Sequence, residues 1–264
     1  MKNYLSERLA QIKPSPTIAI SDKARELRAA GEDVISLSQG EPDFETPEHI
    51  KVAAIRAMQD GHTRYTAVDG IPELKQAIRE KFKLDNGLSY EHSQISVSTG
   101  GKQVLYNAFM ATLNAGDEVI IPAPYWVSYP DMVVLAEGRP VIAACLAQND
   151  FKLTAEELEA AITPATRWLI LNSPSNPTGS VYNQHELKAL AEVLLRHPQI
   201  LVMSDDIYEH LIYGKAEFST LAQVEPKLFS RTLTCNGMSK AYCMTGWRVG
   251  FAGGPEPLIR AMAK

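Results

Sequence analysis

The stretch Trp168-Leu169-Ile170-Leu171-Asn172-Ser173-Pro174-Ser175-Asn176-Pro177-Thr178-Gly179 decides how this chain folds. It begins as a near-continuous apolar run, which is typical of a strand buried on both faces of a sheet. The proline-rich polar loop that follows is too rigid to be an ordinary connector. A helix is predicted next, over residues 186–196, and a second apolar strand follows at Ile200-Leu201-Val202-Met203.

The same order of strand, loop and helix recurs over most of the chain. We expect further strands over residues 33–37, 94–98, 118–121, 140–145, 231–234 and 249–252. We expect further helices over residues 21–31 (with Ser21 as the cap), 46–61 and 72–86, after Gly101, after Thr154, and from Pro255 onward. Short apolar strands separated by helices indicate an α/β fold, in which helices cover both faces of a mostly parallel sheet.

In sheets of this kind, ligands bind beyond the carboxyl ends of the strands. Side chains and glycines suited to binding or catalysis follow the predicted strand ends along this chain. They are Gly100, Gly101, Lys102, Trp126, Asn176, Asp205, Tyr208 and Lys240. Unrelated surface residues would be scattered, so this shared location indicates a single site.

Each of these residues also has an ordinary structural explanation. Lys240 alone is most simply a surface lysine, and Trp126 alone is most simply part of the core. The Gly-Gly pair is commonly a tight turn, and Gly40 is as readily a turn glycine as a point where a ligand approaches the backbone. An acid at a strand end often caps a helix, and Asp206 competes with Asp205 for any special role.

Lys240 follows a short apolar run and is flanked by small residues. Burial disfavours the charged form of a lysine, lowers its pKa and lets it attack a carbonyl as a Schiff-base nucleophile. Arg248, eight residues further on, could bind a phosphate through two hydrogen bonds. An aldehyde together with a phosphate suggests pyridoxal phosphate (PLP). Once displaced by an amino substrate, Lys240 would become the base that moves the substrate's proton.

The other members of the set suit the same cofactor. A pyridine ring withdraws electrons only while its nitrogen is protonated, and Asp205 beside that nitrogen would raise the pKa of the nitrogen. Asn176 and Tyr208 could hydrogen-bond to the phenolate oxygen of the ring, and Trp126 could stack on its face. The groups available for the phosphate are Arg248, Ser239 and the amides of Gly100, Gly101 and Lys102 at a helix start.

The composition argues against several classes of function. A net charge of -5 predicts no basic face, so we expect no nucleic-acid partner and no membrane partner. Residues 1–13 lack the apolar segment of a secretory signal, and no apolar run is long enough to span a membrane. The three cysteines have no paired spacing, which favours a reducing cytoplasm. The six histidines lie far apart, so no metal site is expected.

Several motifs, in order and spacing, resemble the class I pyridoxal-phosphate-dependent aminotransferases, and within them the bacterial aspartate aminotransferase branch. They are residues 38–44, 65–70, 122–126, 173–179, 246–250, Ser204-Asp205-Asp206-Ile207-Tyr208-Glu209-His210 and Gly237-Met238-Ser239-Lys240. The resemblance covers essentially the whole chain. It implies the fold-type I PLP transferase architecture, a homodimer with active sites at the interface, and ping-pong amino transfer between amino acid and 2-oxo acid substrates.

Carried over by position, the resemblance makes Lys240 the Schiff-base lysine and Asp205 the partner of the pyridine nitrogen, with Tyr208 as the third catalytic residue. The expected contacts of the cofactor ring are Tyr208, Asn176 and Trp126. The expected phosphate contacts are Gly100, Gly101, Lys102, Ser239 and Arg248, with Tyr65 reaching the phosphate of the neighbouring subunit. Gly40, Trp126 and Asn176 are expected to touch the substrate carboxylate.

The chain departs from the family pattern in three ways. Asp206 stands where relatives often have glutamate, and Gly237 stands where some have a serine that contacts the phosphate. The family continues past residue 264, so the arginine that pairs with the substrate α-carboxylate has no counterpart here. We therefore expect residues 1–45 to form an N-terminal arm and part of a small domain, and residues 46–264 to form an incomplete PLP-binding large domain. In such a fragment we expect PLP to bind while transamination is badly impaired.

The expected reaction is transfer of an amino group from an L-amino acid, with aspartate as the expected donor, to 2-oxoglutarate. Lys102 is a candidate for binding the second carboxylate of an acidic substrate. Three interpretations stay open beside this one: an aromatic or alanine aminotransferase, a carbon–sulfur lyase on the same fold, and a non-catalytic PLP-binding fragment. A nicotinamide enzyme is disfavoured because no Gly-x-Gly-x-x-Gly motif follows the first strands.

Overall fold

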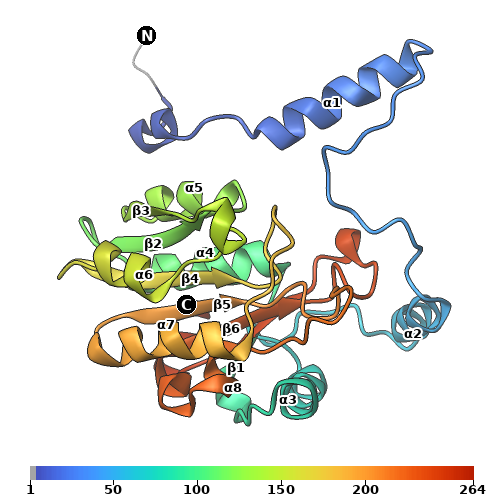
Figure 1. Cartoon of the computed structure of the whole chain (residues 1–264). Coiled ribbons are helices and arrows are strands. Elements are labelled where there is room, and N and C mark those ends of the chain that lie inside the picture. Colours follow the sequence, from blue (N-terminus) through green and yellow to red (C-terminus); the bar gives the residue numbers. More distant parts are fainter. Residues whose placement is uncertain (1–3) are drawn as a thin grey trace.

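The protein is built around one mixed sheet at the centre of Figure 1. The computed structural model describes residues 4–264. Seven strands lie in the order β1-β7-β6-β5-β4-β2-β3. They are β1 Ile95–Ser98, β2 Glu118–Ala123, β3 Arg139–Ala144, β4 Thr166–Asn172, β5 Leu201–Asp205, β6 Thr232–Gly237 and β7 Gly250–Gly253. Neighbouring strands are parallel except around β7, which runs antiparallel to both β1 and β6.

Helices lie on both sides of this sheet (Figure 1). The α-helices are α1 Pro16–Ala29, α2 Glu48–Gln59, α3 Pro72–Asn86, α4 Gly101–Thr112, α5 Ser128–Leu135, α6 Ala155–Ala161, α7 Gln184–Arg196, α8 Leu221–Val224 and α9 Glu256–Met262. Short 3-10 turns are η1 Glu7–Gln11, η2 His92–Gln94, η3 Ala147–Asn149, η4 Pro226–Arg231 and η5 Thr245–Trp247.

The side chains of β4 show why both faces of the sheet are covered. Trp168 and Ile170 point into a core shared with α4, α5 and α9. Leu169 and Leu171 point into a second core shared with α6 and α7. Because successive residues of a strand face opposite sides, a continuous apolar run needs a covering layer on each side. The predicted α/β fold with a mostly parallel sheet is confirmed.

Several predicted helix boundaries are confirmed by local chemistry. α3 begins at Pro72, and Gly87 ends it in the left-handed conformation with a φ of 66°. Phe82 on its inner face makes edge-to-face ring contacts with Tyr90 and Phe251, which attach α3 to the β1–β7 edge of the sheet. At α6, the Thr154 hydroxyl accepts a hydrogen bond from the N–H of Glu157, forming the predicted capping box.

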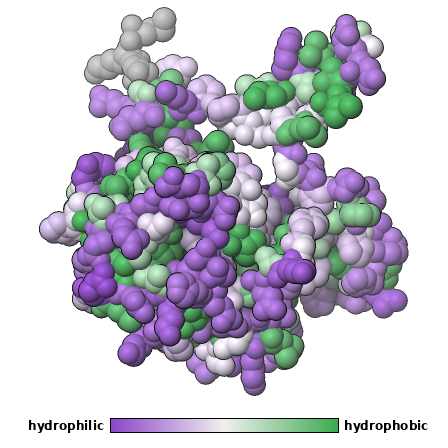
Figure 2. Space-filling view, in the orientation of Figure 1, coloured by the Kyte–Doolittle hydropathy of each residue, from purple (hydrophilic) through white to green (hydrophobic). Residues whose placement is uncertain are grey.

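The N-terminal segment lies largely apart from the sheet, and two predictions for it are wrong. Residues 33–37 do not form a strand; Ile35 is 85% exposed and Leu37 is 93% exposed, and neither pairs with a neighbouring strand. The predicted helix exists, but α1 starts at Pro16, so Ser21 lies inside it and does not cap it. Figure 2 shows apolar surface on the projecting α1. The domain division at residue 45 stays a prediction.

Smaller differences concern α2, α5 and α8. The predicted cap of α2, Thr46, instead donates its hydroxyl hydrogen to the carbonyl oxygen of Cys243 at 2.6 Å, and Pro47 precedes the helix. α5 and α8 were not predicted.

Within residues 4–264, no helix is both long enough and apolar enough to span a bilayer.

Candidate active site

The register of the sheet brings the ends of three strands together. Asn172 of β4 lies opposite Asp205 of β5, and Asp205 lies opposite Cys235 of β6. Asn176, Tyr208 and Lys240 follow these strand ends within a few residues. The structure therefore gathers the predicted residues of these three loops at the carboxyl edge of the parallel strands, where α/β proteins bind ligands.

Asp205 is a buried carboxylate held in a fixed orientation. The Tyr129 hydroxyl donates a hydrogen bond to its Oδ2 at 2.6 Å, and the Asn172 side chain donates to its backbone carbonyl at 2.8 Å. Burial raises the pKa of Asp205, and the hydrogen bond from Tyr129 opposes that rise. A carboxylate of raised pKa that is aimed from a strand end suits a protonated ring nitrogen, because the two groups can share the proton.

The competing acid, Asp206, faces a different environment. The Ser204 hydroxyl donates to its Oδ1 at 2.8 Å, and its backbone N–H bonds to the carbonyl of Cys235. Ser204 also contacts Thr220, which lies just before α8. Asp205 is therefore the better placed of the two for a ligand beside α5.

Lys240 is half-buried and lies over the ring of Tyr208, with Nζ 5.7 Å from the ring centroid. Its Nζ donates a hydrogen bond to the carbonyl oxygen of Gly40 at 2.6 Å. Burial lowers the pKa of Lys240; Glu41 raises it, and the nearby Arg248 lowers it further. A lysine of lowered pKa is more often the neutral amine, which is the nucleophilic form.

The segment around Gly40 is held to the lysine loop by several contacts. The Thr245 hydroxyl donates to the carboxylate of Glu41, and the indole N–H of Trp247 donates to the Thr46 hydroxyl at 3.2 Å. This segment therefore lies against the lysine loop, although Gly40 is 200 residues away from Lys240 in the chain. A contact between Gly40 and the substrate stays a prediction.

Arg248 and Gly250 pack closely against the residues where α4 begins. A side chain at Gly250 would overlap the backbone of Gly100 and Gly101, and a side chain at Gly100 would overlap the guanidinium of Arg248. The arginine thus lies directly against the start of the helix, where free N–H groups and the helix dipole favour anions. Within residues 4–264, no carboxylate forms an ion pair with Arg248; its Nη1 donates to the carbonyl of Thr245 at 2.8 Å.

The remaining predicted residues fall into two groups. The Lys102 ammonium lies 4.9 Å from the ring centroid of Trp126, which is half-buried and contacts the ring of Tyr129 edge-on. The side-chain amide of Asn176 donates to the Tyr208 hydroxyl at 3.5 Å, and burial raises the pKa of Tyr208.

Ser239 directly precedes Lys240 and is half-buried. The structure does not bring Tyr65 to the group: its side chain is fully exposed, and no hydrogen bond or ring contact in the described part of the chain joins it to the others.

Two residues of the site were missed by the sequence analysis. Tyr129 lies on α5, a helix that was not predicted, and no motif marks it. Asn172 was quoted as the end of an apolar strand, but no role was assigned to it. Its side-chain Oδ1 accepts from the N–H of Asn176 at 2.8 Å while its amide bonds to Asp205, so it fixes two site residues at once.

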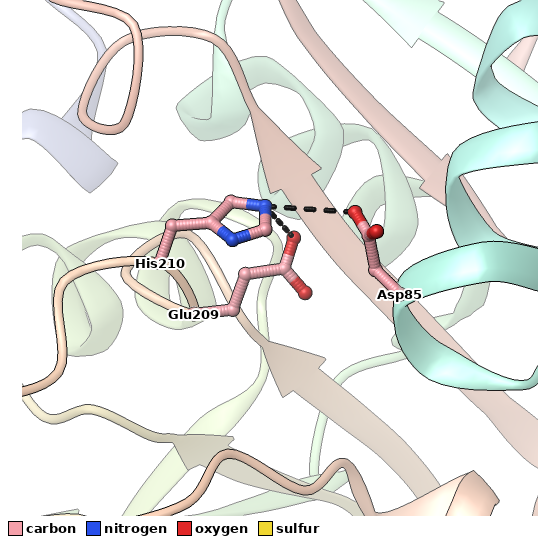
Figure 3. A group of neighbouring side chains, drawn as sticks. All are labelled: Asp85, Glu209 and His210. Atoms are coloured by element: carbon pink, nitrogen blue, oxygen red, sulfur yellow. Dashed lines mark ion pairs between the residues drawn. The ribbon is translucent and has the colours of Figure 1, made fainter.

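In the described part of the chain, one group of side chains has ligand atoms close enough together to hold a metal ion. The sequence analysis expected no metal site, because the histidines lie far apart in the sequence. Asp85, Glu209 and His210 offer ligand atoms within 4.8 Å of one another, as Figure 3 shows. The Lys81 ammonium forms ion pairs with Glu209 and with Asp85, so a cation already balances these carboxylates. We assign no metal to this group.

The geometry of these residues defines a class of site. A lysine of lowered pKa, an arginine against a helix start and a buried carboxylate fit a phosphorylated pyridine aldehyde such as pyridoxal phosphate. Comparison with known proteins agrees: residues 32–264 match the family model of aminotransferase class I and II, and the chain belongs to that family. The enzymes of this family depend on PLP, and the predicted family resemblance is confirmed.

Individual relatives are similar over nearly the whole chain. The chain is 66% identical to an aspartate/prephenate aminotransferase of Cereibacter sphaeroides, and the match covers 98% of this chain and 65% of the relative. The aspartate aminotransferase structure from Rhizobium meliloti superposes with a TM-score of 0.96 at 56% identity, covering 99% of this chain and 65% of that one. For the Thermus thermophilus enzyme with maleate, the TM-score is 0.95 at 48% identity, with 99% and 67% covered. The chain thus spans about two thirds of the length of these relatives.

Proposed function

We propose that this chain carries the cofactor site of a PLP-dependent aminotransferase that moves the amino group of an L-amino acid to 2-oxoglutarate, with aspartate as the donor. The observation that carries the proposal is Lys240: it has a lowered pKa, lies over Tyr208 and is found at the same sheet edge as Asp205. The names of the relatives support aspartate as the amino donor.

Bound PLP would supply an aldehyde for the amine and a ring that withdraws electrons. Lys240 would hold the cofactor covalently and, once released, would accept or return the proton at the substrate α-carbon. Asp205 would keep the ring nitrogen protonated, because its burial and its bond from Tyr129 leave a fixed acceptor there. Asn176 and Tyr208 would donate to the ring oxygen.

The other residues would bind and orient. Arg248, Ser239 and the amides of Gly100, Gly101 and Lys102 would hold the phosphate at the start of α4. Trp126 would lie against the ring face, and Gly40, Trp126 and Asn176 would touch the substrate carboxylate. Together these contacts hold the reacting atoms in one orientation and exclude water from the ring.

We also propose that the protein works as a cytoplasmic homodimer in which Tyr65 reaches the phosphate of the other subunit. The full exposure of Tyr65 supports this, as do exposed apolar side chains on α1, α2 and the segment between them: Ile18, Ile20, Ile35, Leu37, Ile55 and Met58. The three cysteines are free, which fits a reducing compartment. Residues 1–45 would belong to a small domain and residues 46–264 to the cofactor-binding domain.

The test is a set of absorption spectra of the purified chain with PLP, before and after aspartate is added. We expect a visible band that is absent from the Lys240→Ala variant and that aspartate converts to the spectrum of the amine form of the cofactor. Because this chain spans about two thirds of the length of its relatives, the aspartate step is repeated with a longer chain of full family length. A Lys240-dependent band that ignores aspartate there too would refute the donor. The absence of any Lys240-dependent band would refute a working cofactor site in this chain.

A second acceptor is favoured by a specific observation. The relative at 66% identity is named for prephenate as well as aspartate, and a Pyrococcus horikoshii structure at a TM-score of 0.85 and 41% identity, which covers 91% of this chain and 64% of that one, is an aromatic aminotransferase. We propose prephenate as an alternative oxo acid for the same site. Starting from the amine form of the cofactor, recovery of the Lys240-dependent band with prephenate would support this, and recovery with 2-oxoglutarate alone would contradict it.

A further inference from the structure

A buried carboxylate lies directly behind the candidate site, on the residue that follows Tyr208. Glu209 is 5% exposed, and both of its carboxylate oxygens have partners. The Asn86 amide donates to Oε2 at 2.8 Å, and the Asn236 amide donates to Oε1 at 2.7 Å. Lys81 forms an ion pair with the same carboxylate. A buried charge with this many donors is fully compensated, so it can hold its surroundings in one arrangement.

These partners come from three separate parts of the fold. Lys81 and Asn86 lie on α3, Glu209 lies on the loop after β5, and Asn236 lies near the end of β6. Figure 3 shows Glu209 reaching from its loop toward α3, beside His210 and Asp85. One carboxylate therefore ties the loop that bears Tyr208 to a helix on one side and to a sheet strand on the other.

The link to β6 continues toward Lys240. Besides donating to Glu209, Asn236 accepts a hydrogen bond from the N–H of Gly237 on its Oδ1 at 2.8 Å. Gly237 is the last residue of β6 and stands three positions before Lys240. The connection starts at the backbone of Tyr208, which is followed by Glu209. It continues through the Glu209 carboxylate and the Asn236 side-chain amide to the backbone of Gly237, which leads into Lys240.

We propose that Glu209 is a positioning residue that fixes Lys240 relative to Tyr208. The 5.7 Å between Nζ and the Tyr208 ring centroid is then set from behind the site by the Glu209 carboxylate. This inference rests on the proposed function in so far as Lys240 and Tyr208 act on the cofactor. A carboxylate present only to stabilise the fold would not need its bond to Asn236, because Lys81 and Asn86 already compensate its charge.

A second buried ion pair serves as a matched control. Glu118 is 1% exposed and pairs with Arg139, but it opens β2, at the other end of a strand from the site. Removing the charge of Glu118 takes the ion-pair partner from Arg139, and removing the charge of Glu209 takes one of two from Lys81, which keeps Asp85. Each change should lower stability. Only Glu209 connects to the site residues. Effects that Glu209→Gln shows and Glu118→Gln lacks therefore report positioning and not stability alone.

The experiment compares the full chain with its E209Q and E118Q variants by two measurements. The first is amide hydrogen exchange without cofactor, followed over residues 206–211 and 237–242. We expect exchange in both segments to be at least about tenfold faster in E209Q, the effect of losing one charge-assisted hydrogen bond, and unchanged in E118Q. The second is the pH midpoint of the Lys240-dependent absorption band with PLP, which we expect to shift in E209Q only.

Two results would overturn the inference: wild-type exchange rates in both segments of E209Q, or equal shifts of the band midpoint in E209Q and E118Q. If the wild-type chain shows no Lys240-dependent band, the proposed function fails for this chain, while the exchange comparison still decides the role of Glu209. If E209Q does not fold, Asn236→Ala removes the β6 link alone. It should speed exchange over residues 237–242 and not over residues 206–211, and unchanged exchange in the former segment would again overturn the inference.

Discussion

Replacing Asp206 with asparagine will change how the stability of the protein responds to pH. Asp206 is buried, its Oδ1 accepts a hydrogen bond from the Ser204 hydroxyl, and the Thr220 hydroxyl also acts on its carboxylate. Burial raises the pKa of this carboxyl group from 3.8 to about 7, and the charges of Glu209 and Asp205 add to the rise. The ionised form is therefore disfavoured in the folded protein.

The direction in which the free energy of unfolding changes with pH depends on whether the folded or the unfolded chain holds the Asp206 proton more tightly. Between pH values of about 4 and 7 the folded protein keeps the proton that the unfolded chain loses, so the free energy of unfolding falls as pH rises through this window. The gap between 3.8 and about 7 corresponds to on the order of 4 kcal/mol when it is fully expressed. Asparagine cannot ionise, so the variant lacks this loss.

The assay is urea unfolding of the wild type and D206N at intervals from about pH 4 to about pH 8, with the free energy extrapolated to water. The stability of D206N relative to the wild type should rise across the window and level off above it. The control is Asp150→Asn, at an exposed aspartate. The difference in unfolding free energy between this variant and the wild type should not rise across the window. A flat difference for D206N would refute the assignment of a raised pKa to this carboxyl group.

Three further changes test the site. Gly250→Ala should lower the free energy of unfolding by about 1–3 kcal/mol, because the new methyl group overlaps the backbone of Gly100; an unchanged melting temperature would contradict the close approach. Tyr129→Phe should cost about 1–3 kcal/mol in urea unfolding and raise the pKa of Asp205 further, since the lost hydrogen bond lowers it; unchanged stability would show that the bond is not formed. Arg248→Lys should weaken PLP binding about tenfold in a spectroscopic titration, because lysine cannot bind phosphate through two parallel hydrogen bonds; equal affinity would remove Arg248 from the phosphate site.

The sheet was predictable because its strands are short apolar runs with clear ends. β4 illustrates this: four consecutive apolar residues can be buried only between two helical layers, and the structure shows both layers. Residues 33–37 show the limit of the same argument. Ile35 and Leu37 alternate with polar residues as in a strand, but a strand also needs a neighbour to bond with, and no local pattern says whether a neighbour exists.

The position of the candidate site at the strand ends could be predicted from the sequence, but the contacts among its side chains could not. The residue pattern alone did not separate Asp205 from Asp206, and only the family resemblance chose Asp205. The choice depends on which face of β5 is covered by α5. The core shared with α5 contains Met203, and Asp205 stands two residues further along the same strand, so it shares that face. Because α5 was not predicted, neither was Tyr129, whose hydroxyl orients the carboxylate.

The hydrogen bond between Gly40 and Lys240 spans 200 residues of sequence, and this bears on how the protein is made. A ribosome releases the chain from its N-terminus, so the segment around Gly40 emerges long before the lysine that it contacts. Local elements such as α3 can form during synthesis, whereas the wall of the site closes only after β6 has been added to the sheet. Under the proposed function, a cofactor held by Lys240 would therefore be acquired late, after β6 has joined the sheet.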